Sequence, residues 1–471
     1  MFAKRAADIA AHGPAKRHRP ASPFRAIIGC IQSGKTAECV RQIKASPNFC
    51  LVIVRNVGPD VRQFMNACKR AGVNAVTFSS DRGAQALSCG VLCPPKVVVL
   101  LANALNVRKA RQALEAAGCP PFTLFIDEAD KIAFSTEPSD RSFRAELERL
   151  QDDAAEQVFV TATMFNFMTL QEVGGVMTRE DITFMDTARD YCGIEDILFG
   201  DRTLADAEYG GDKFIPEHEE GCDAKGVDKV PESLTTWIKD LVTDADGSGA
   251  ALAALGHPKF ALARMGNKIE TIVMIARECK RLTHKVIPIV YTGDGVAAPT
   301  FLLEWLGCHG FALKYTRYKR LDRYSLLSLL SLQQFISVLR ESGAVGTNVV
   351  VVCAGVLAAR GVNFTDAEYK WAITHEYFLP AKTMNVTELQ QGLRLLGNKP
   401  WTLEQFRPIL TTKHSVMRNI EIGCIVTAET RERVESGDVS LREAVSAIEL
   451  DDKPSVRYAQ NMVINSVRKA D

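Results

Sequence analysis

The chain has 471 residues, which is more than one ordinary hydrophobic core serves and is enough for two or three domains. Apolar residues make up 46% and charged residues 24% of it, which excludes a disordered or fibrous protein. The 57 basic residues almost balance the 56 acidic ones, so any surface for a polyanion has to be local. The 13 cysteines include no Cys-x-x-Cys pair, and no apolar run is long enough to cross a bilayer. We therefore expect a soluble intracellular protein from a reducing compartment, with neither a zinc ribbon nor a membrane partner.

Residues 1–23 differ in composition from the rest of the chain. They are rich in Ala, Pro and basic residues and hold a single acid, which predicts a disordered basic tail. Lys4 and Arg5 precede a second basic cluster at residues 16–19, and this arrangement resembles a bipartite nuclear localisation signal. A solvated tail that holds polyanions and an organelle-targeting leader fit the same residues, so all three interpretations stay open.

Residues 24–200 are predicted to form a first α/β domain. Short runs of Val, Ile and Leu alternate with segments of helical spacing, which is typical of strands buried on both faces of a parallel sheet. The expected strands cover residues 24–28, 50–57, 96–101, 122–127 and 157–163. The segments 58–72 and 107–118 have amphipathic spacing and end on a glycine that can cap a helix.

The remaining chain is predicted to hold a second α/β domain. Residues 201–258 are rich in Gly, Pro and charge, which favours a linker or irregular insertion with one helix-like stretch at residues 233–242. From 259 to 400 strands and helices alternate again, with expected strands at 259–265, 286–293, 349–355 and 370–376. Residues 401–471 form a C-terminal extension without a motif.

The first chemical signal is the spacing Gly29-x-x-x-x-Gly34-Lys35-Thr36, which follows the expected strand 24–28. A loop between a strand and a helix directs backbone N–H groups and the helix N-terminus at an anion. Lys35 is expected to reach the β and γ phosphates of ATP, and the Thr36 hydroxyl is expected to bind Mg²⁺. The loop residues expected around the phosphates are Gly29, Gln32, Ser33 and Gly34.

A second signal, "DEAD" at residues 127–130, supplies the acids that such a loop requires. Asp127 ends an apolar strand, so its carboxylate is expected at the carboxyl edge of the sheet, where the phosphates lie. Asp127 would hold the Mg²⁺ directly or through water, and Glu128 would polarise the attacking water as a general base.

These two motifs resemble those of the superfamily 2 helicases and translocases. That resemblance implies two tandem RecA-like domains, with parallel sheets flanked by helices and the ATP site in the cleft between them. "TAT" at residues 161–163 is similar to motif III of the family, so Thr161 and Thr163 would link hydrolysis to nucleic-acid binding. "GVLAARGVNF" is similar to motif V, so Arg360 and Gly361 would lie near the nucleotide and the phosphodiester backbone. In "LQQGLRLLG", which resembles motif VI, Arg394 would be the arginine finger.

Several positions depart from the family pattern. In motif VI, Leu393 precedes Arg394, and Gly397 stands where a second arginine is usual. In motif V, Asn363 replaces the usual Asp and Gly355 the usual Thr. No glutamine motif that reads adenine is recognisable upstream of the loop, which speaks against a DEAD-box RNA helicase. Such relaxed motifs look more like those of helicases from large DNA viruses and phages.

The track for nucleic acid is the least visible part of the sequence. "LKYTRYKRLDRY" at residues 313–324 interleaves tyrosines with cations, and such a stretch suits a single strand; a solvated connection is the equally open alternative. The basic residues assigned to the track are Lys314, Arg317, Lys319 and Arg320. Arg55 and Asn103, which follow strands of the first domain, are further candidates.

The function predicted from these patterns is Mg²⁺-dependent ATP hydrolysis coupled to movement on nucleic acid, with DNA favoured over RNA. Two alternatives stay open: a P-loop ATPase or nucleotide switch that does not unwind, and a nucleic-acid-binding protein that is not an enzyme.

Overall fold

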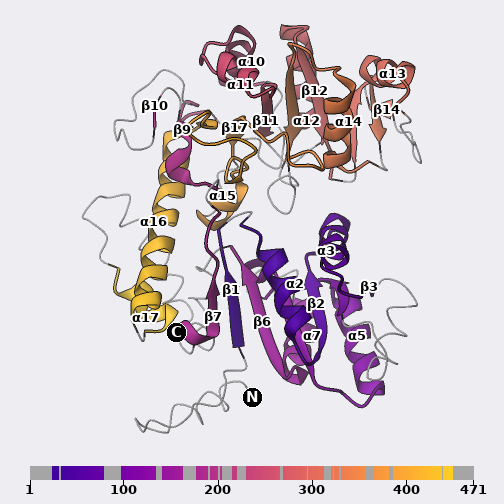
Figure 1. The fold of residues 1–471 in the computed structure, drawn as a ribbon, viewed down its shortest axis with the longest axis vertical. Coiled ribbons are helices and arrows are strands. Elements are labelled where there is room, and N and C mark those ends of the chain that lie inside the picture. The colour runs from indigo at the N-terminus through magenta and orange to yellow at the C-terminus, as the bar shows by residue number, and fades with distance from the viewer. Residues whose placement is uncertain are drawn as a thin grey trace. The chain divides into compact units, whose positions relative to one another are not determined.

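The structure is a computed structural model (Figure 1). The residues that it describes are 24–30, 33–78, 97–133, 141–162, 177–188, 191–199, 202–203, 215–219, 230–265, 269–293, 295–311, 320–321, 323–327, 330–355, 364–380, 386–437 and 439–448. Within these ranges no helix is both long and apolar enough to traverse a lipid bilayer. The chain divides into two compact units: residues 1–187 with 425–471 form unit 1, and residues 188–424 form unit 2.

Unit 1 is built on a seven-stranded sheet whose strands all run parallel. Their order across the sheet is β3 (Ala75–Thr77), β4 (Val97–Leu101), β2 (Phe49–Val54), β5 (Phe122–Asp127), β6 (Glu156–Thr161), β1 (Phe24–Ile28) and β7 (Ile182–Phe184). The runs of Val, Ile and Leu are buried on both faces of this sheet, as expected for parallel strands.

Helices cover both faces of the unit 1 sheet. One face packs against α2 (Lys35–Ala45) and α3 (Gly58–Arg70), and the other packs against α5 (Ala104–Ala116) and α7 (Arg141–Asp153). Alternate residues of a strand point to opposite faces, so Ile27 packs with α2 while its neighbour Ile28 packs with α5. A four-residue helix, α6 (Ala129–Ile132), follows directly after β5.

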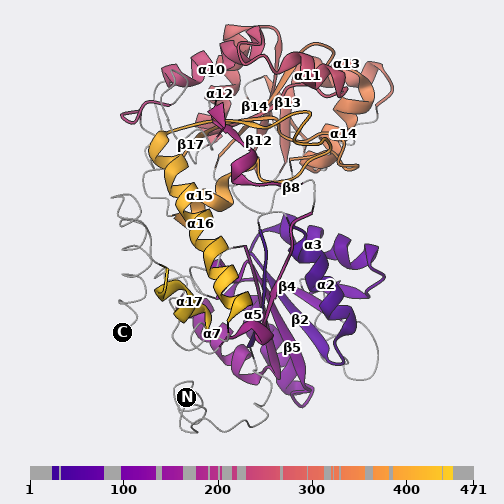
Figure 2. The same cartoon turned by 60° about the vertical axis from the view of Figure 1, so that its left-hand side comes forward.

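The C-terminal residues return to unit 1. The helix α16 (His414–Ser436) begins in unit 2, and its residues from Ile425 onward belong to unit 1, as does α17 (Leu441–Ser446). Val434, Leu441 and Ala444 are buried in the same core as Met177 and Ile182. Figures 1 and 2 show α17 and the later turns of α16 close to β7, the edge strand of the sheet. These residues therefore complete the core of unit 1 at that edge.

Unit 2 is built on a ten-stranded sheet with a parallel centre and antiparallel edges. The strand order is β10 (Arg202–Thr203), β9 (Leu198–Phe199), β19 (Ile409–Thr412), β17 (His375–Leu379), β11 (Phe260–Met265), β16 (Val349–Ala354), β12 (Val286–Tyr291), β13 (Val296–Pro299), β15 (Tyr324–Leu327) and β14 (Arg320–Leu321). A separate antiparallel pair joins β8 (Tyr191–Cys192) to β18 (Gly397–Asn398).

The helices of unit 2 are α10 (Glu232–Thr243), α11 (Gly249–Ala254), α12 (Ile269–Leu282), α13 (Thr300–Cys308), α14 (Leu332–Ser342) and α15 (Val386–Gly392). The segment expected as a linker thus contains α10, whose apolar face includes the buried Trp237 and packs in the same core as α12. The boundaries of α14 follow from local chemistry. The Ser331 side chain accepts the Gln334 N–H in a capping box, and Gly343 ends the helix with a φ of +65°.

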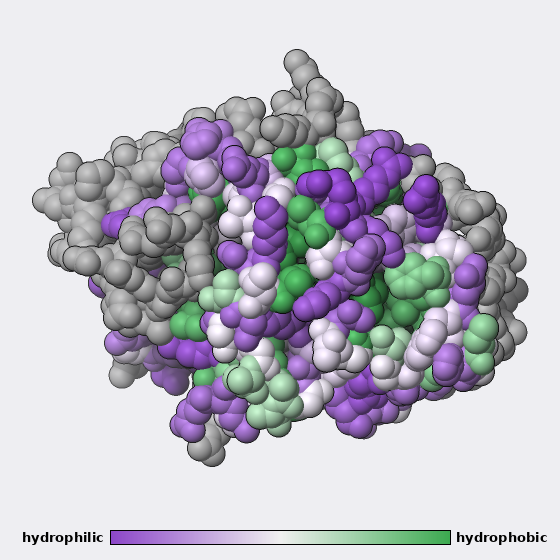
Figure 3. All heavy atoms as spheres, turned by 90° about the horizontal axis from the view of Figure 1, so that it is seen from above, coloured by the Kyte–Doolittle hydropathy of each residue, from purple (hydrophilic) through white to green (hydrophobic). Residues whose placement is uncertain are grey.

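Figure 3 views the face of unit 2 that lies at the top of Figure 1, where hydrophobic side chains lie in hollows between hydrophilic ones. A cavity of about 540 Å³ in unit 2 is lined by residues of α10, α11 and the loop between α14 and β16. The predicted α/β class is confirmed: each of the two units has a sheet flanked by helices, and this sheet is wholly parallel in unit 1 and parallel at its centre in unit 2.

Candidate nucleotide site

The candidate residues of unit 1 gather at one edge of its sheet. Five adjacent strands, in the order β4, β2, β5, β6 and β1, end at Leu101, Val54, Asp127, Thr161 and Ile28. Because the strands are parallel, the residues that follow them also lie at this edge. Asn103, Arg55, Glu128, Ala162 and Gly29 are therefore successive neighbours along the carboxyl ends of the strands, where parallel sheets bind ligands.

The described residues of the phosphate loop, 29–30 and 33–36, have a backbone that fits their sequence. Gly34 adopts a φ of +91° immediately before α2, a conformation that favours glycine. A Cβ on Gly29 would come within 2.6 Å of Ser33 Oγ and 3.0 Å of Met185 Cβ, so this position has no room for a side chain. The Lys35 ammonium donates to the carbonyl oxygens of Cys30, at 2.8 Å, and Gly29, at 3.3 Å. The loop is thus folded around the side chain expected to reach the phosphates.

The loop also fits a nucleotide phosphate. Ser33 Oγ is buried and has no hydrogen-bond partner among the described residues, so it can donate to an anion in the loop. Thr36 stands in the first turn of α2, where the helix dipole favours negative charge. Burial lowers the pKa of Lys35, and the charges of Glu128 and Asp127 oppose this effect, which places both acids near the ammonium. A site for Mg²⁺ and phosphate requires a cation for the phosphate and hydroxyl and carboxylate oxygens for the Mg²⁺, and these groups are present here.

Asp127 and Glu128 take different positions after β5. Burial and then the charge of Glu128 raise the pKa of Asp127 to about 7. A bound cation would oppose both effects and favour the carboxylate, as expected for a metal ligand. Glu128 has a φ of +52°, which is uncommon for a residue with a side chain, and its N–H donates to Asp127 Oδ1 at 3.1 Å. With this backbone, the side chains of two successive acids, Asp127 and Glu128, both start at the end of one strand, β5.

Asp130, for which the sequence suggested no role, links the acidic motif to the next strand. Thr161 is fully buried at the end of β6, and its hydroxyl donates to Asp130 Oδ1 at 3.1 Å. Thr161 therefore holds the acidic motif, while its assignment to nucleic acid stays a prediction. Asp130 is a buried residue of the short helix α6, which carries no pattern that sequence analysis could have recognised.

Arg55 and Asn103, the two candidates for nucleic acid in this unit, have partners within the protein. Arg55 forms a two-bond ion pair with Asp60, at 2.6 and 3.0 Å, and its side chain is 17% exposed. Asn103 caps α5 by accepting the Asn106 N–H at 2.9 Å, and its amide donates to Asn56. Both side chains stand at the correct edge, but contact with a nucleic acid requires each of them to share or leave these partners.

Arg394, the predicted arginine finger, is 5% exposed within unit 2. Its guanidinium donates to the carbonyl oxygens of Gln391 and Gly392, and its N–H donates to Glu376 Oε2 at 2.8 Å. Glu376 is fully buried on β17 and forms an ion pair with Arg264 of β11 at 3.3 Å. Sequence reasoning missed this pair because two single charges in apolar strands carry no recognisable spacing.

The structure explains why two positions of the predicted motif VI are glycines. A Cβ on Gly392 would lie 3.1 Å from Phe378 Cζ and 3.5 Å from an Arg264 nitrogen, so the end of α15 packs tightly on this pair. Gly397 has a φ of +114° and pairs with Cys192 in the small sheet. An arginine, the usual family residue at this position, would be strained in that backbone. The departure from the family pattern therefore accompanies a local strand pairing.

Several predicted residues lie outside the described part of the chain: Gln32, Thr163, Lys314, Arg317, Lys319, Arg360 and Gly361, together with the basic tail at 1–23. Arg320 is described only as the first residue of β14, at the edge of the unit 2 sheet. Tyr324, which the sequence placed among the stacking candidates, is 5% exposed and packs in the core of unit 2. It is therefore not available to stack on a base.

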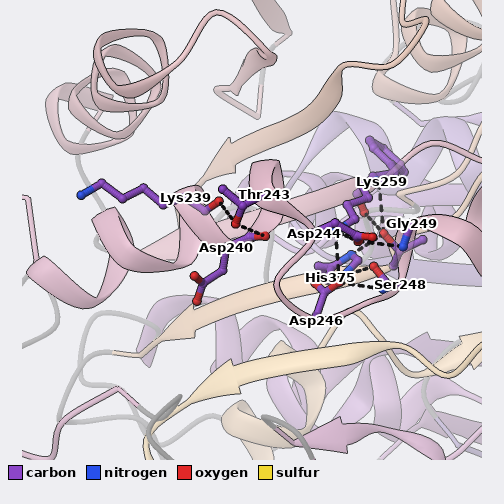
Figure 4. Close-up of polar contacts among 11 residues, drawn as sticks. Lys239, Asp240, Thr243, Asp244, Asp246, Ser248, Gly249, Lys259 and His375 are labelled. Carbon is purple, nitrogen blue, oxygen red and sulfur yellow. Dashed lines mark hydrogen bonds and ion pairs between the residues drawn. The ribbon is translucent and has the colours of Figure 1, made fainter.

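A second polar cluster, in unit 2, resembles a hydrolase site only superficially (Figure 4). Asp246 Oδ2 and Ser248 Oγ lie 3.0 and 3.3 Å from the same nitrogen, Nε2 of the buried His375. A catalytic triad requires the carboxylate and the nucleophile on different nitrogens. The Lys259 ammonium, at 3.0 Å from Asp246 Oδ1, completes a network that ties the segment after α10 to β11 and β17. This cluster is structural.

No protein-family model matches the sequence, and no curated protein matches it. Among solved structures, S. cerevisiae Dbp5 bound to RNA and ADP BeF3 is 12% identical, with a TM-score of 0.41 over 99% of this chain and 93% of that chain. The E. coli DExH-box NTPase HrpB is 10% identical, with a TM-score of 0.43 over 83% of this chain and 39% of that chain. At TM-scores below 0.5 these likenesses add nothing to the site, which rests on the residues of this chain.

Proposed function

We propose that the chain is an ATPase of the superfamily 2 helicase and translocase type, which hydrolyses Mg²⁺-ATP and acts on nucleic acid. The observation that carries this proposal is the convergence at one sheet edge of a phosphate loop containing Lys35 with the successive acids Asp127 and Glu128. A loop alone would suit any phosphate. The nearby acids add the groups that hydrolysis requires.

Each residue of this site has a specific role in the proposal. Lys35 leaves the carbonyl oxygens of its own loop and neutralises the β and γ phosphates, while backbone N–H groups of the loop and of the first turn of α2 hold them. Thr36 and Asp127 are the residues that would hold Mg²⁺, which when bound neutralises charge on the phosphates. Glu128 accepts a proton from the attacking water.

Unit 2 supplies further residues of the nucleotide site in this proposal. Arg394 acts as the arginine finger, and Arg360 and Gly361 lie near the nucleotide. Because the Arg394 guanidinium is bonded to two main-chain carbonyl oxygens, it has to exchange these acceptors for the γ phosphate. An arginine finger stabilises charge that develops in the transition state, so we expect Arg394 to affect hydrolysis more than binding of ATP.

The experiment that tests the proposal is ATP turnover by the full chain, with single- and double-stranded DNA and RNA added separately. We expect hydrolysis that at least one polymer stimulates, with DNA ahead of RNA. Hydrolysis that no polymer changes would identify a P-loop ATPase or nucleotide switch. Polymer binding without any hydrolysis would identify a nucleic-acid-binding protein that is not an enzyme, and would overturn the proposal.

The track at residues 313–324 has a separate test. Replacing Arg317, Lys319 and Arg320 by Ala should weaken binding uniformly across sequences and reduce its salt dependence, because fewer counterions are released. Affinity for ATP should not change. Wild-type affinity with an unaltered salt slope would identify the stretch as a solvated connection. We further propose that the basic clusters at residues 4–19 direct the protein to the nucleus, which fusion of residues 1–23 to a fluorescent protein would test.

A further inference from the structure

We propose that Arg431, in the part of α16 that belongs to unit 1, positions the phosphate loop through Met185. This inference rests on the proposed function, because it concerns the same phosphate loop. It gives a role to residues that the motifs leave unexplained. Arg431 does not touch the nucleotide in this proposal and is a positioning residue.

Met185 lies against the phosphate loop on two sides. Its N–H donates to the carbonyl oxygen of Ile28 at 2.8 Å, which continues the pairing of β7 with β1 up to the residue that precedes the loop. Its Cβ lies 3.0 Å from the position that a Cβ on Gly29 would occupy, and its Cε lies 4.0 Å from the corresponding position on Gly34. The Met185 side chain therefore lies close to both glycines of the loop.

Arg431 holds Met185 from the side of the C-terminal helix. One terminal nitrogen donates to the Met185 carbonyl oxygen at 3.1 Å, and the guanidinium carbon lies 5.6 Å from the centroid of the Phe184 ring. Glu435, one turn further along α16, accepts from Arg431 Nε at 3.0 Å and fixes the orientation of the guanidinium. These contacts reach the last residue of β7 and the residue after it.

One further contact of Arg431 is incidental to its bond with Met185. Arg431 also forms an ion pair with Asp186 at 2.6 Å, but the Asp186 side chain is 91% exposed, and exposed pairs contribute little. The bond to the Met185 carbonyl is more sheltered, since it is partly buried while the bond to Asp186 is exposed. The end of β7 is held by few contacts, because β7 is a three-residue edge strand paired on one side.

The expected consequence of losing this bond is a looser phosphate loop. Without Arg431, Met185 keeps its bond to β1 and its packing on the apolar core but loses its bond to α16, and the loop samples conformations in which its N–H groups no longer converge on a phosphate. Nucleotide affinity then falls because part of the binding free energy is spent on ordering the loop. The rate of the bound complex changes less, since Lys35, Asp127 and Glu128 are intact.

The test measures the dissociation constant of a fluorescent Mg²⁺-ADP analogue with the full chain, at a temperature well below unfolding. Arg431→Ala should weaken binding by about tenfold, which is in the usual range for coupling between sites. Two matched controls should bind like the wild type: Asp186→Asn, which removes only the exposed ion pair, and Arg433→Ala, which removes a neighbouring arginine of α16. Arg431→Lys, which can keep one bond to the carbonyl, should give an intermediate affinity.

A double-mutant cycle decides whether Met185 is the route. Met185→Ala should weaken binding by itself, and Arg431→Ala should add little on that background. Additive effects, or wild-type affinity of Arg431→Ala, would overturn the inference. If Arg431→Ala does not fold, two other single variants decide. Wild-type affinity of both Arg431→Lys and Met185→Ala would also overturn the inference. Failure of the proposed function has another signature: the wild type itself would not bind the analogue, or Lys35→Ala would bind it normally.

Discussion

Removing one partner of the buried ion pair between Arg264 and Glu376 should lower the free energy of unfolding of unit 2. The size of this loss follows from the structure. Glu376 is 0% and Arg264 3% exposed, and burial raises the pKa of Glu376 and lowers that of Arg264. Each charge therefore depends on the other. The substitution Glu376→Gln keeps an oxygen that can accept the Arg394 N–H, so the main change is an uncompensated charge on Arg264.

Breaking a buried pair by removing one partner usually costs 3–5 kcal/mol. Arg264 keeps a bond to the Gly392 carbonyl oxygen and a position 4.6 Å from the centroid of the Phe378 ring, so we expect the lower end, about 3 kcal/mol. The double variant Arg264→Met with Glu376→Leu should cost less than Glu376→Gln alone, because it leaves no buried charge.

Intrinsic fluorescence can follow this change in unit 2 alone. All four tryptophans of the chain belong to unit 2, and Trp237, Trp371 and Trp401 are buried there. Urea unfolding followed by tryptophan emission should therefore show a lower midpoint for Glu376→Gln. The matched control, Glu368→Gln, removes an acid of the same unit that is 54% exposed and should leave the midpoint unchanged. Equal midpoints for the two variants would refute the reasoning.

Three further predictions concern separate parts of the chain. Burial lowers the pKa of His257 to about 4, and its Nε2 accepts the Ala372 N–H at 3.1 Å, so unit 2 should lose about 3 kcal/mol as pH falls from 6.5 to 4. His257→Asn should flatten that loss in urea titrations of tryptophan emission, and no difference from the wild type would contradict it. Lys35→Ala should weaken nucleotide binding about 100-fold in a direct titration, and normal affinity would remove the nucleotide site. Arg394→Ala should keep ATP affinity while lowering kcat about 10³-fold, and an unchanged kcat would exclude it as the finger.

The sign of the His257 effect follows from the bonds of its ring. Nδ1 lies 2.7 Å from the Pro258 carbonyl oxygen and donates to it, so the neutral ring satisfies both nitrogens. Protonation would place a second N–H against the Ala372 N–H. The folded state thus binds fewer protons than the unfolded state between pH 6.5 and 4. The stability that neutral His257 contributes is complete above pH 6.5 and is lost as pH falls through this range. The exposed His284, replaced by Asn, is the control.

The sequence predicted the strands and the phosphate loop well because both depend on local patterns. Continuous Val and Ile runs became parallel strands, and the glycine spacing became a loop in which Gly34 has a positive φ. The short strand β7 carried too little pattern to be recognised. The return of α16 and α17 to unit 1 depends on residues far apart in the chain, such as Val434 and Ile182, being buried in one core, and no local signal encodes this.

The candidate site was predictable only as far as its motifs extend. Lys35, Asp127 and Glu128 were identified because spacing and strand ends place them at one edge. The partners that hold these motifs were not. Asp60 accepts hydrogen bonds from Arg55, and Glu376 accepts the N–H of Arg394. Each is a single acid whose role depends on its burial and on residues that only the fold brings close to it. Such positioning residues become visible only with the side chains in place.

The most direct test of the central claim compares ATP hydrolysis by the wild type and Glu128→Gln, with and without nucleic acid. This substitution removes the general base and changes little geometry. We expect turnover of the wild type to rise with nucleic acid and turnover of Glu128→Gln to fall by about 10²–10⁴-fold, with the affinities for ATP and nucleic acid retained. Equal turnover in the two proteins, or affinity that falls as much as the rate, would contradict the account.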